Sequence, residues 1–206
     1  MLDFNTLVFR VPALLFAITI HEYAHAQAAD AMGDPTPRYM GRLTMNPLAH
    51  LDVFGALMLV IVGFGWAKPV AIDDNNFRNR RDGILKVSLA GPAANLFVCF
   101  LAALVAAVMQ NFGLLSNGVY QFLLWMQLYN VWFAFFNLIP VPPLDGAKIL
   151  CTLLPAKQAW EYDNFVGSYG IYILLALVFT GVIGMIINPL AGLYMGIVSS
   201  ILGLIF

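Results

Sequence analysis

The chain has 206 residues, of which 61% are hydrophobic and 10% charged, and its formal net charge is -1 at pH 7. Soluble domains usually carry about 45–50% apolar and about 25% charged residues, so this composition excludes an ordinary soluble protein. The nearly neutral total gives no indication of nucleic-acid binding. We therefore expect a multi-pass integral membrane protein that forms a single domain over residues 1–206.

Long apolar stretches predict the helices that cross the membrane, because a spanning helix needs about 20 mostly apolar residues. In chain order they cover residues 7–31, 84–110, 120–139, 170–187 and a shorter stretch, 190–206. Asn188-Pro189 is predicted to interrupt the helix before the last stretch, which then crosses the membrane or re-enters it. The expected fold is all-α, with about five transmembrane or partly spanning helices. Its core covers residues 7–155, and C-terminal helices cover residues 168–206.

The connection between the first two helices, residues 32–82, is rich in Pro, Gly, Asn and Asp. It contains an apolar run over residues 55–66 that is too short to span as a helix and has the Val and Ile content typical of strands. We predict a small membrane-associated β-hairpin with strands over residues 57–62 and 66–72. Because lipid does not satisfy exposed strand edges, this hairpin must pack on the helices or line a wet cavity.

The basic residues are distributed unequally between the two ends of the predicted helices. Of the ten Lys and Arg residues, Arg10 alone lies on the N-terminal side of the membrane. The other nine are Arg38, Arg42, Lys68, Arg78, Arg80, Arg81, Lys86, Lys148 and Lys157. Since cytoplasmic loops carry an excess of Lys and Arg, we expect the N-terminus outside and both large connections in the cytoplasm. The membrane is expected to be the cell (inner or plasma) membrane.

The first predicted helix carries His21-Glu22-Tyr23-Ala24-His25, an H-E-x-x-H pattern. Residues four apart share a helix face, so both imidazoles can reach one metal ion, and Glu22 can address a water on that metal. Two histidines, a carboxylate and an open position are typical of catalytic zinc. Ionisable residues inside a membrane helix are costly and usually functional, which disfavours a chance match. We expect one Zn²⁺ per chain, with His21 and His25 as ligands and Glu22 as the catalytic base.

Two further polar residues are candidates for the same site. Asp145 follows the proline-rich residues 140–143, and it is either the third zinc ligand or the N-cap of the next helix. Asn95 lies nine residues from the cytoplasmic end of its helix, as Glu22 does, so both are about 14 Å deep. We expect Asn95 to bind the substrate carbonyl or its oxyanion, with a hydrogen bond between helices as the alternative.

Three motifs together resemble the site-2 protease family of intramembrane zinc metalloproteases. They are His21-Glu22-Tyr23-Ala24-His25, Gly91-Pro92-Ala93-Ala94-Asn95 and residues 137–146, NLIPVPPLDG. The resemblance covers residues 10–155, and residues 41–50, GRLTMNPLAH, are similar to shorter members without a PDZ or CBS domain. It implies that Asp145 is a metal ligand and that Asn95 lies at the active site. It also implies that residues 55–72 receive the substrate as an extended strand.

The predicted function is hydrolysis of peptide bonds in or near transmembrane segments of other membrane proteins. The expected partners are a transmembrane protein or peptide and the lipid bilayer, without nucleic acid. The alternatives are a membrane metal-binding or transport protein, and an inactive relative that binds transmembrane helices. The polar groups cluster in the cytoplasmic half, which disfavours an ion path across the membrane. Glu22 is intact, which disfavours an inactive relative.

Overall fold

The computed structural model describes residues 4–52, 54–55 and 67–206, and the long elements of this part are all helices. They are α1 (Phe4–Met32), α5 (Arg80–Asn111), α6 (Asn117–Asn137), α7 (Asp145–Leu153), α8 (Ala156–Phe179) and α9 (Val182–Gly203). The connection from α1 to α5 contains the short helices α2 (Thr36–Tyr39) and α3 (Pro47–His50) and a 3₁₀ turn, η1 (Asp74–Asn76). The prediction of an all-α protein is confirmed for these residues.

In the part of the chain that the structure describes, four helices are long and apolar enough to cross a membrane: α1 over Thr6–Met32, α5, α8 and α9. This finding confirms a multi-pass membrane protein. The predicted third spanning helix corresponds to α6, which is not among the four. Its Asn, Gln and Tyr residues lower its mean hydropathy, and α6 packs against α1, α5 and α9. A helix that neighbours cover on several sides needs a less apolar surface than one that faces lipid.

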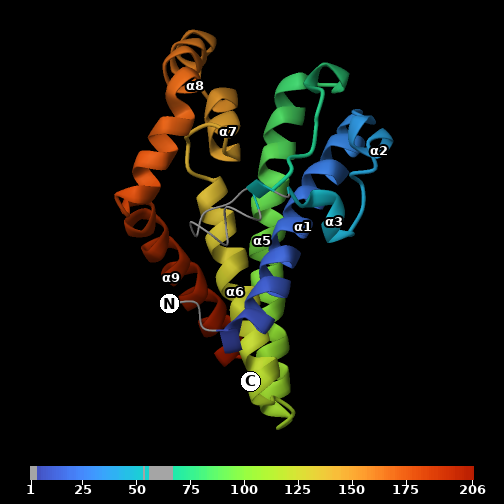
Figure 1. Ribbon diagram of the computed structural model, residues 1–206, viewed down its shortest axis with the longest axis vertical. Coiled ribbons are helices and arrows are strands. Elements are labelled where there is room, and N and C mark those ends of the chain that lie inside the picture. The colour runs from blue at the N-terminus through green and yellow to red at the C-terminus, as the bar shows by residue number, and fades with distance from the viewer. Residues whose placement is uncertain (1–3, 53, 56–66) are drawn as a thin grey trace.

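Helices α1, α5 and α6 pack side by side to form the centre of the molecule (Figure 1). Their contact is lined by Ala13, Val98, Ala102, Leu123 and Met126, all buried. Small side chains such as Ala13 let membrane helices approach closely, which replaces the hydrophobic driving force that lipid does not provide. This packing fixes the relative positions of the three helices that surround the predicted active site.

Helices α8 and α9 follow one another in the same direction as α5, with a bend between them (Figure 1). Tyr194 in α9 donates a hydrogen bond to the Leu96 carbonyl of α5, 2.7 Å away, and Val198 packs with Ala103 further along both helices. The bend lies at Gly181, whose φ of 76° is readily adopted by glycine. The predicted interruption at Asn188-Pro189 is wrong, because α9 continues through Pro189, as membrane helices tolerate proline.

The predicted β-hairpin is not supported. Its first strand, residues 57–62, lies outside the described residues, and residues 67–72 contain no strand. A single antiparallel bridge pairs Leu51 with Ala67. The physical reason is that side chains use the main-chain groups a strand would need. The Lys68 and Pro69 carbonyls accept from Arg42, and the Val70 amide donates to Glu22.

The connection between α1 and α5 is also held by Asp34, which is fully buried. Its carboxylate accepts hydrogen bonds from the Thr36 amide and hydroxyl, the Asp73 amide and the Asn76 side chain. Burial by itself raises the pKa of Asp34, but these donors outweigh burial and hold the pKa below its usual value. Asp34 therefore ties the end of α1 to the η1 turn as a charged group.

Candidate metal centre

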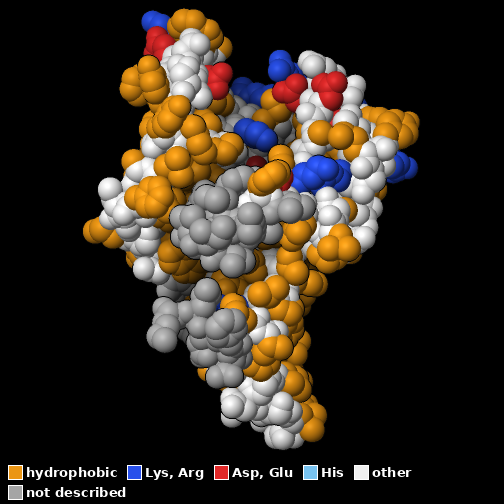
Figure 2. Space-filling view, in the orientation of Figure 1, with side chains coloured by type: hydrophobic (Ala, Val, Ile, Leu, Met, Phe, Trp, Pro, Cys, Tyr) orange, Lys and Arg blue, Asp and Glu red, His pale blue; other side chains and the backbone are white. Residues whose placement is uncertain are grey.

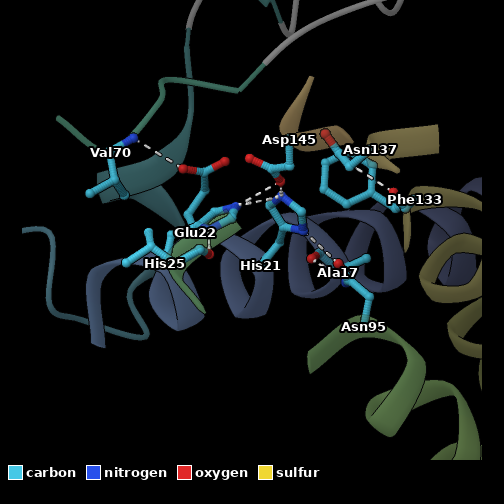
Figure 3. Close-up of polar contacts among 10 residues, drawn as sticks. Ala17, His21, Glu22, His25, Val70, Asn95, Phe133, Asn137 and Asp145 are labelled. Atoms are coloured by element: carbon cyan, nitrogen blue, oxygen red, sulfur yellow. Dashed lines mark hydrogen bonds and ion pairs between the residues drawn. The ribbon is translucent and has the colours of Figure 1, made fainter. Parts of the chain in front are cut away.

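Two buried histidine side chains of α1 meet a buried carboxylate from a distant part of the chain (Figure 3). The Nε2 atoms of His21 and His25 are 3.0 Å apart, and Asp145 Oδ2 lies 3.3 Å from the first and 3.0 Å from the second. Their exposed fractions are 3%, 7% and 7%. The structure therefore brings the three residues that we predicted as zinc ligands within reach of a single ion.

The hydrogen bonds of the two Nδ1 atoms determine which ring nitrogens carry a hydrogen and which present a lone pair toward Asp145. His21 Nδ1 lies 2.7 Å from the Asn95 side-chain oxygen, and His25 Nδ1 lies 2.7 Å from the Val87 carbonyl. Both partners are acceptors, so in neutral rings both Nδ1 atoms carry the hydrogen and both Nε2 atoms present lone pairs. Neither imidazole can then donate to the other ring or to Asp145.

The three converging atoms fit a bound cation. Among the described residues, none donates a hydrogen bond to the buried Asp145 Oδ2. Three lone pairs at 3.0–3.3 Å repel one another unless a positive charge lies between them. Tetrahedral zinc with bonds of about 2.0–2.1 Å places neighbouring ligand atoms about 3.3 Å apart. The donor types, two imidazoles and one carboxylate, are those of catalytic zinc sites that keep a fourth position open.

Asp145 is the first residue of α7, and Leu144 occupies the N-cap position. The Asp145 side chain points at the two histidines (Figure 3), and within the described residues it accepts no hydrogen bond from the first turn of α7. The N-cap alternative is therefore not realised. The next residue, Gly146, lies so close to the Leu138 and Ile139 carbonyls that a Cβ would collide with main-chain atoms. This contact holds the start of α7 against the end of α6.

Gly91 in α5 provides the space in which the two imidazoles lie. A Cβ on this residue would be 2.5 Å from His25 Nε2 and 2.6 Å from His21 Cε1, closer than real Cβ contacts come. Any side chain at position 91 must displace the rings. The glycine of the Gly91-Pro92-Ala93-Ala94-Asn95 motif thus has a specific packing role that its spacing alone did not indicate.

Asn95 lies behind His21 and has an exposed fraction of 0%. Its oxygen faces His21, and its amide donates to the Ala17 carbonyl and the Asn130 side-chain oxygen at 2.9 and 2.8 Å. Asn130, in α6, in turn donates to the Met126 carbonyl. Contact between Asn95 and the substrate stays a prediction, while the contacts seen here join three helices behind one imidazole. Sequence reasoning missed Asn130, although an asparagine within an apolar helix is itself a signal.

Glu22 lies next to the two histidines on α1 and is 8% exposed. Its Oε2 accepts a hydrogen bond from the Val70 amide, 3.1 Å away (Figure 3). A main-chain donor has no side-chain signature, so this contact could not be predicted from the sequence. His50 is buried elsewhere, with Nε2 2.9 Å from the Thr44 carbonyl, and is not part of the metal-binding group.

A cleft of about 890 Å³ runs between the beginnings of α5 and α8 and helix α7. The metal-binding side chains do not line it, but Val87 and Leu144, which directly adjoin them, do. Charged side chains also line it, among them Arg81 and Lys148. In Figure 2 charged side chains gather at this end of the visible face, and most of the other described surface is hydrophobic.

Known proteins with similar sequences carry names that agree with this geometry. The model of peptidase family M50 matches residues 112–181. The Bacillus subtilis protein "Putative zinc metalloprotease YwhC" is 39% identical over 176 residues, which cover 82% of this chain and 80% of that protein. "Putative zinc metalloprotease Rip2" of Mycolicibacterium smegmatis is 30% identical over 163 residues, covering 72% of this chain and 61% of Rip2.

A more distant relative is "Zinc metalloprotease MJ0392" of Methanocaldococcus jannaschii, 28% identical over 106 residues, or 51% of this chain and 30% of that protein. No solved structure matches the chain significantly. The similarity to YwhC covers 82% of this chain and 80% of that protein. The chain therefore belongs to peptidase family M50, the site-2 protease family of zinc metalloproteases.

Proposed function

We propose that the protein hydrolyses peptide bonds in or next to transmembrane segments of other membrane proteins, with zinc held by His21, His25 and Asp145. The observation that supports this most strongly is the convergence of two imidazole nitrogens and one carboxylate oxygen inside a bundle of apolar helices. Zinc in such a set polarises a carbonyl group and makes a water molecule acidic near neutral pH.

Glu22 is the proposed general base. Its carboxylate lies one residue from His21 on the same helix and has one oxygen, Oε1, without a hydrogen bond in the described part of the chain. We assign to Glu22 the removal of a proton from the attacking water and its delivery to the leaving amine. Its low exposure, 8%, keeps this exchange away from bulk solvent.

Asn95 and Asn130 support the metal centre from behind. By accepting from His21 Nδ1, the Asn95 oxygen fixes the tautomer and the plane of the ring, and Asn130 in turn holds the Asn95 amide. Partners of this kind are general in metal sites, where the second nitrogen of a ligating histidine donates to a carbonyl or carboxylate. We propose this orienting role for Asn95. The side chain is fully buried and donates to Ala17 and Asn130, so the proposed substrate contact requires at least one of these hydrogen bonds to break.

The substrate is proposed to be a transmembrane segment that unwinds locally beside α1, α5 and α6. Unwinding is required because a helical peptide keeps its carbonyl groups in internal hydrogen bonds. The excess of Lys and Arg at one end of the bundle supports an orientation with the N-terminus outside and the metal centre nearer the cytoplasm, in the cell membrane. The cleft beside Val87 and Leu144 opens toward this end and suits release of the cytoplasmic product.

The proposal is tested with purified protein and a model transmembrane substrate in detergent or liposomes. We expect about one zinc per chain, cleavage inside or beside the transmembrane segment, and loss of cleavage after chelation that added zinc restores. Bound zinc without cleavage of any membrane substrate would instead favour a metal-binding or transport protein. Comparing membrane fragments from cells with the wild type and with Glu22→Gln would then identify natural substrates.

A further inference from the structure

Residues 41–50 contain a buried arginine that the proposed chemistry does not use. Arg42 is 5% exposed, and in the described part of the chain its charge is matched by main-chain carbonyls rather than by a carboxylate. A buried charge is costly unless it is paired or hydrogen-bonded. The groups around Arg42 therefore indicate what this residue holds in place.

The guanidinium of Arg42 joins two segments of the connection. Nη1 donates to the Ala49 carbonyl in α3 and, at 3.5 Å, to the Lys68 carbonyl, while Nη2 donates to the Pro69 carbonyl at 3.4 Å. Main-chain contacts join the same segments, because the Lys68 amide donates to the His50 carbonyl at 3.0 Å. Arginine suits this position since its donors form a rigid fork that reaches several acceptors at once.

The peptide unit between Pro69 and Val70 connects Arg42 to the metal centre. Its carbonyl accepts from Arg42, and its N–H donates to Glu22 Oε2 at 3.1 Å. This peptide bond is trans, so the oxygen and the hydrogen point in opposite directions from one rigid plane. The side chain that holds the carbonyl therefore also sets the direction of the N–H.

We propose that Arg42 is a positioning residue of the peptidase, which acts through the Pro69-Val70 peptide unit to orient the Glu22 carboxylate. This inference rests on the proposed role of Glu22 as general base. The Val70 amide holds one carboxylate oxygen and leaves the other to exchange a proton with water. Without the amide, the carboxylate turns freely about its last bond and spends less time in the productive direction.

The expected effect is on turnover rather than on metal binding. A displacement of about 1 Å at a catalytic group can cost about 100-fold in rate, so loss of this contact should lower kcat by roughly 10- to 100-fold. KM and zinc content should stay near wild type, because Arg42 and Val70 do not touch His21, His25 or Asp145 in the described structure.

Two proline variants test the amide directly. Val70→Pro removes the N–H that donates to Glu22. Ala71→Pro removes the next N–H, which has no hydrogen bond in the described part of the chain, and so controls for the effect of proline on this extended segment. We expect the large loss of kcat for Val70→Pro and a change of less than about twofold for Ala71→Pro.

Two lysine variants test the arginine. Arg42→Lys keeps the positive charge and therefore disturbs folding less than Arg42→Ala. A single ammonium group cannot donate to the Ala49 and Pro69 carbonyls at the same time. Arg38→Lys is the matched control, because Arg38 is exposed and paired with Asp30 in the same connection. The double variant Arg42→Lys/Val70→Pro should have the same kcat as Val70→Pro alone. Both changes act through the same contact, the hydrogen bond from the Val70 amide to Glu22, so their effects should not add.

The outcomes are read with zinc content and thermal unfolding measured for every variant. Normal kcat in Val70→Pro, or losses that multiply in the double variant, would overturn the positioning role. If Glu22→Gln still cleaves the substrate, the proposed function fails as a whole. If Glu22→Gln is inactive while Val70→Pro and Arg42→Lys match their controls, this inference alone fails.

Discussion

The metal centre and the connection from α1 to α5 are built in opposite ways. At the metal centre, side chains from α1, α5 and α7 meet one another, and each helix satisfies its own main chain. In the connection, the buried charges of Arg42 and Asp34 bind main-chain groups that no helix or sheet satisfies. Helical main chain leaves side chains free for chemistry, whereas buried irregular main chain needs side chains for its own support.

This difference predicts that the two regions fail differently. Changes at the metal centre should remove zinc and activity while the bundle stays folded, because the helices do not depend on the ion for their hydrogen bonds. Changes in the connection should lower stability or turnover while zinc stays bound. Measuring both zinc content and thermal unfolding for a variant tells the two kinds of failure apart.

The largest expected effect is that of Asp145→Ala. Removing the carboxylate leaves two imidazoles to hold the ion, so zinc affinity should fall by more than the roughly 10- to 100-fold typical of supporting residues, and cleavage should fall to background. The zinc content that remains after dialysis against a weak chelator measures the loss of zinc affinity. Asp163→Ala, at an exposed aspartate, is the control, and zinc retained in Asp145→Ala at the control level would remove Asp145 from the ligand set.

Gly91→Ala should be almost as damaging for a purely steric reason. Its methyl group would be 2.5 Å from His25 Nε2 and 2.6 Å from His21 Cε1, so the rings must move away from Asp145. Alanine otherwise stabilises a helix by roughly 0.5–1 kcal/mol relative to glycine, which makes the loss specific. In Gly192→Ala, where a Cβ would meet nothing within 4 Å, zinc binding should be normal. Equal zinc content in both variants would contradict this account.

Asn95→Ala should weaken zinc binding by roughly 10- to 100-fold, because His21 loses the acceptor that fixes its tautomer. Asn130→Ala should weaken it less, since Asn130 touches Asn95 and not His21. Competition with a chromogenic chelator measures both affinities, and Asn111→Ala at the exposed end of α5 is the control. Unchanged affinity in Asn95→Ala would show that the hydrogen bond to His21 has no orienting role.

The smallest effect is expected in the connection, for Asp34→Asn. The low pKa of Asp34 in the folded state means that its charge stabilises the fold above its unfolded pKa of about 3.9, and that this contribution is lost as the pH falls through the folded value. Asp34→Asn should therefore lower the unfolding temperature at pH 7 by a few degrees, at about 2–4 °C per kcal/mol. The difference in unfolding temperature between Asp34→Asn and the wild type should disappear below about pH 4. A difference independent of pH would contradict a charged Asp34.

The same contrast explains how much of the molecule could be predicted from its sequence. The H-E-x-x-H spacing predicted the positions of His21 and His25 because helix geometry alone places residues four apart on one face. An aspartate at position 145 suits either a zinc ligand or a helix N-cap, so residue type did not decide between these roles. Its contact with both histidines depends on how α7 docks on α6. Resemblance to a family supplied what local rules could not.

The connection was predicted poorly for an equally physical reason. Val and Ile content indicated strands, but strands also need free main-chain partners, and residues 68–70 give theirs to Arg42 and Glu22. No local pattern shows that a distant side chain will take these groups. Likewise the bend at Gly181, rather than at Pro189, depends on a left-handed φ that the sequence permits but does not require.

The central claim, that a zinc site on α1 cleaves peptide bonds with Glu22 as base, is tested most directly by Glu22→Gln. This change keeps the shape of the side chain and leaves His21, His25 and Asp145 in place, but the amide cannot accept a proton from water. We expect about one zinc per chain, normal thermal unfolding and no cleavage of a transmembrane substrate that the wild type cleaves. Cleavage by the zinc-loaded variant at a rate near wild type would contradict it.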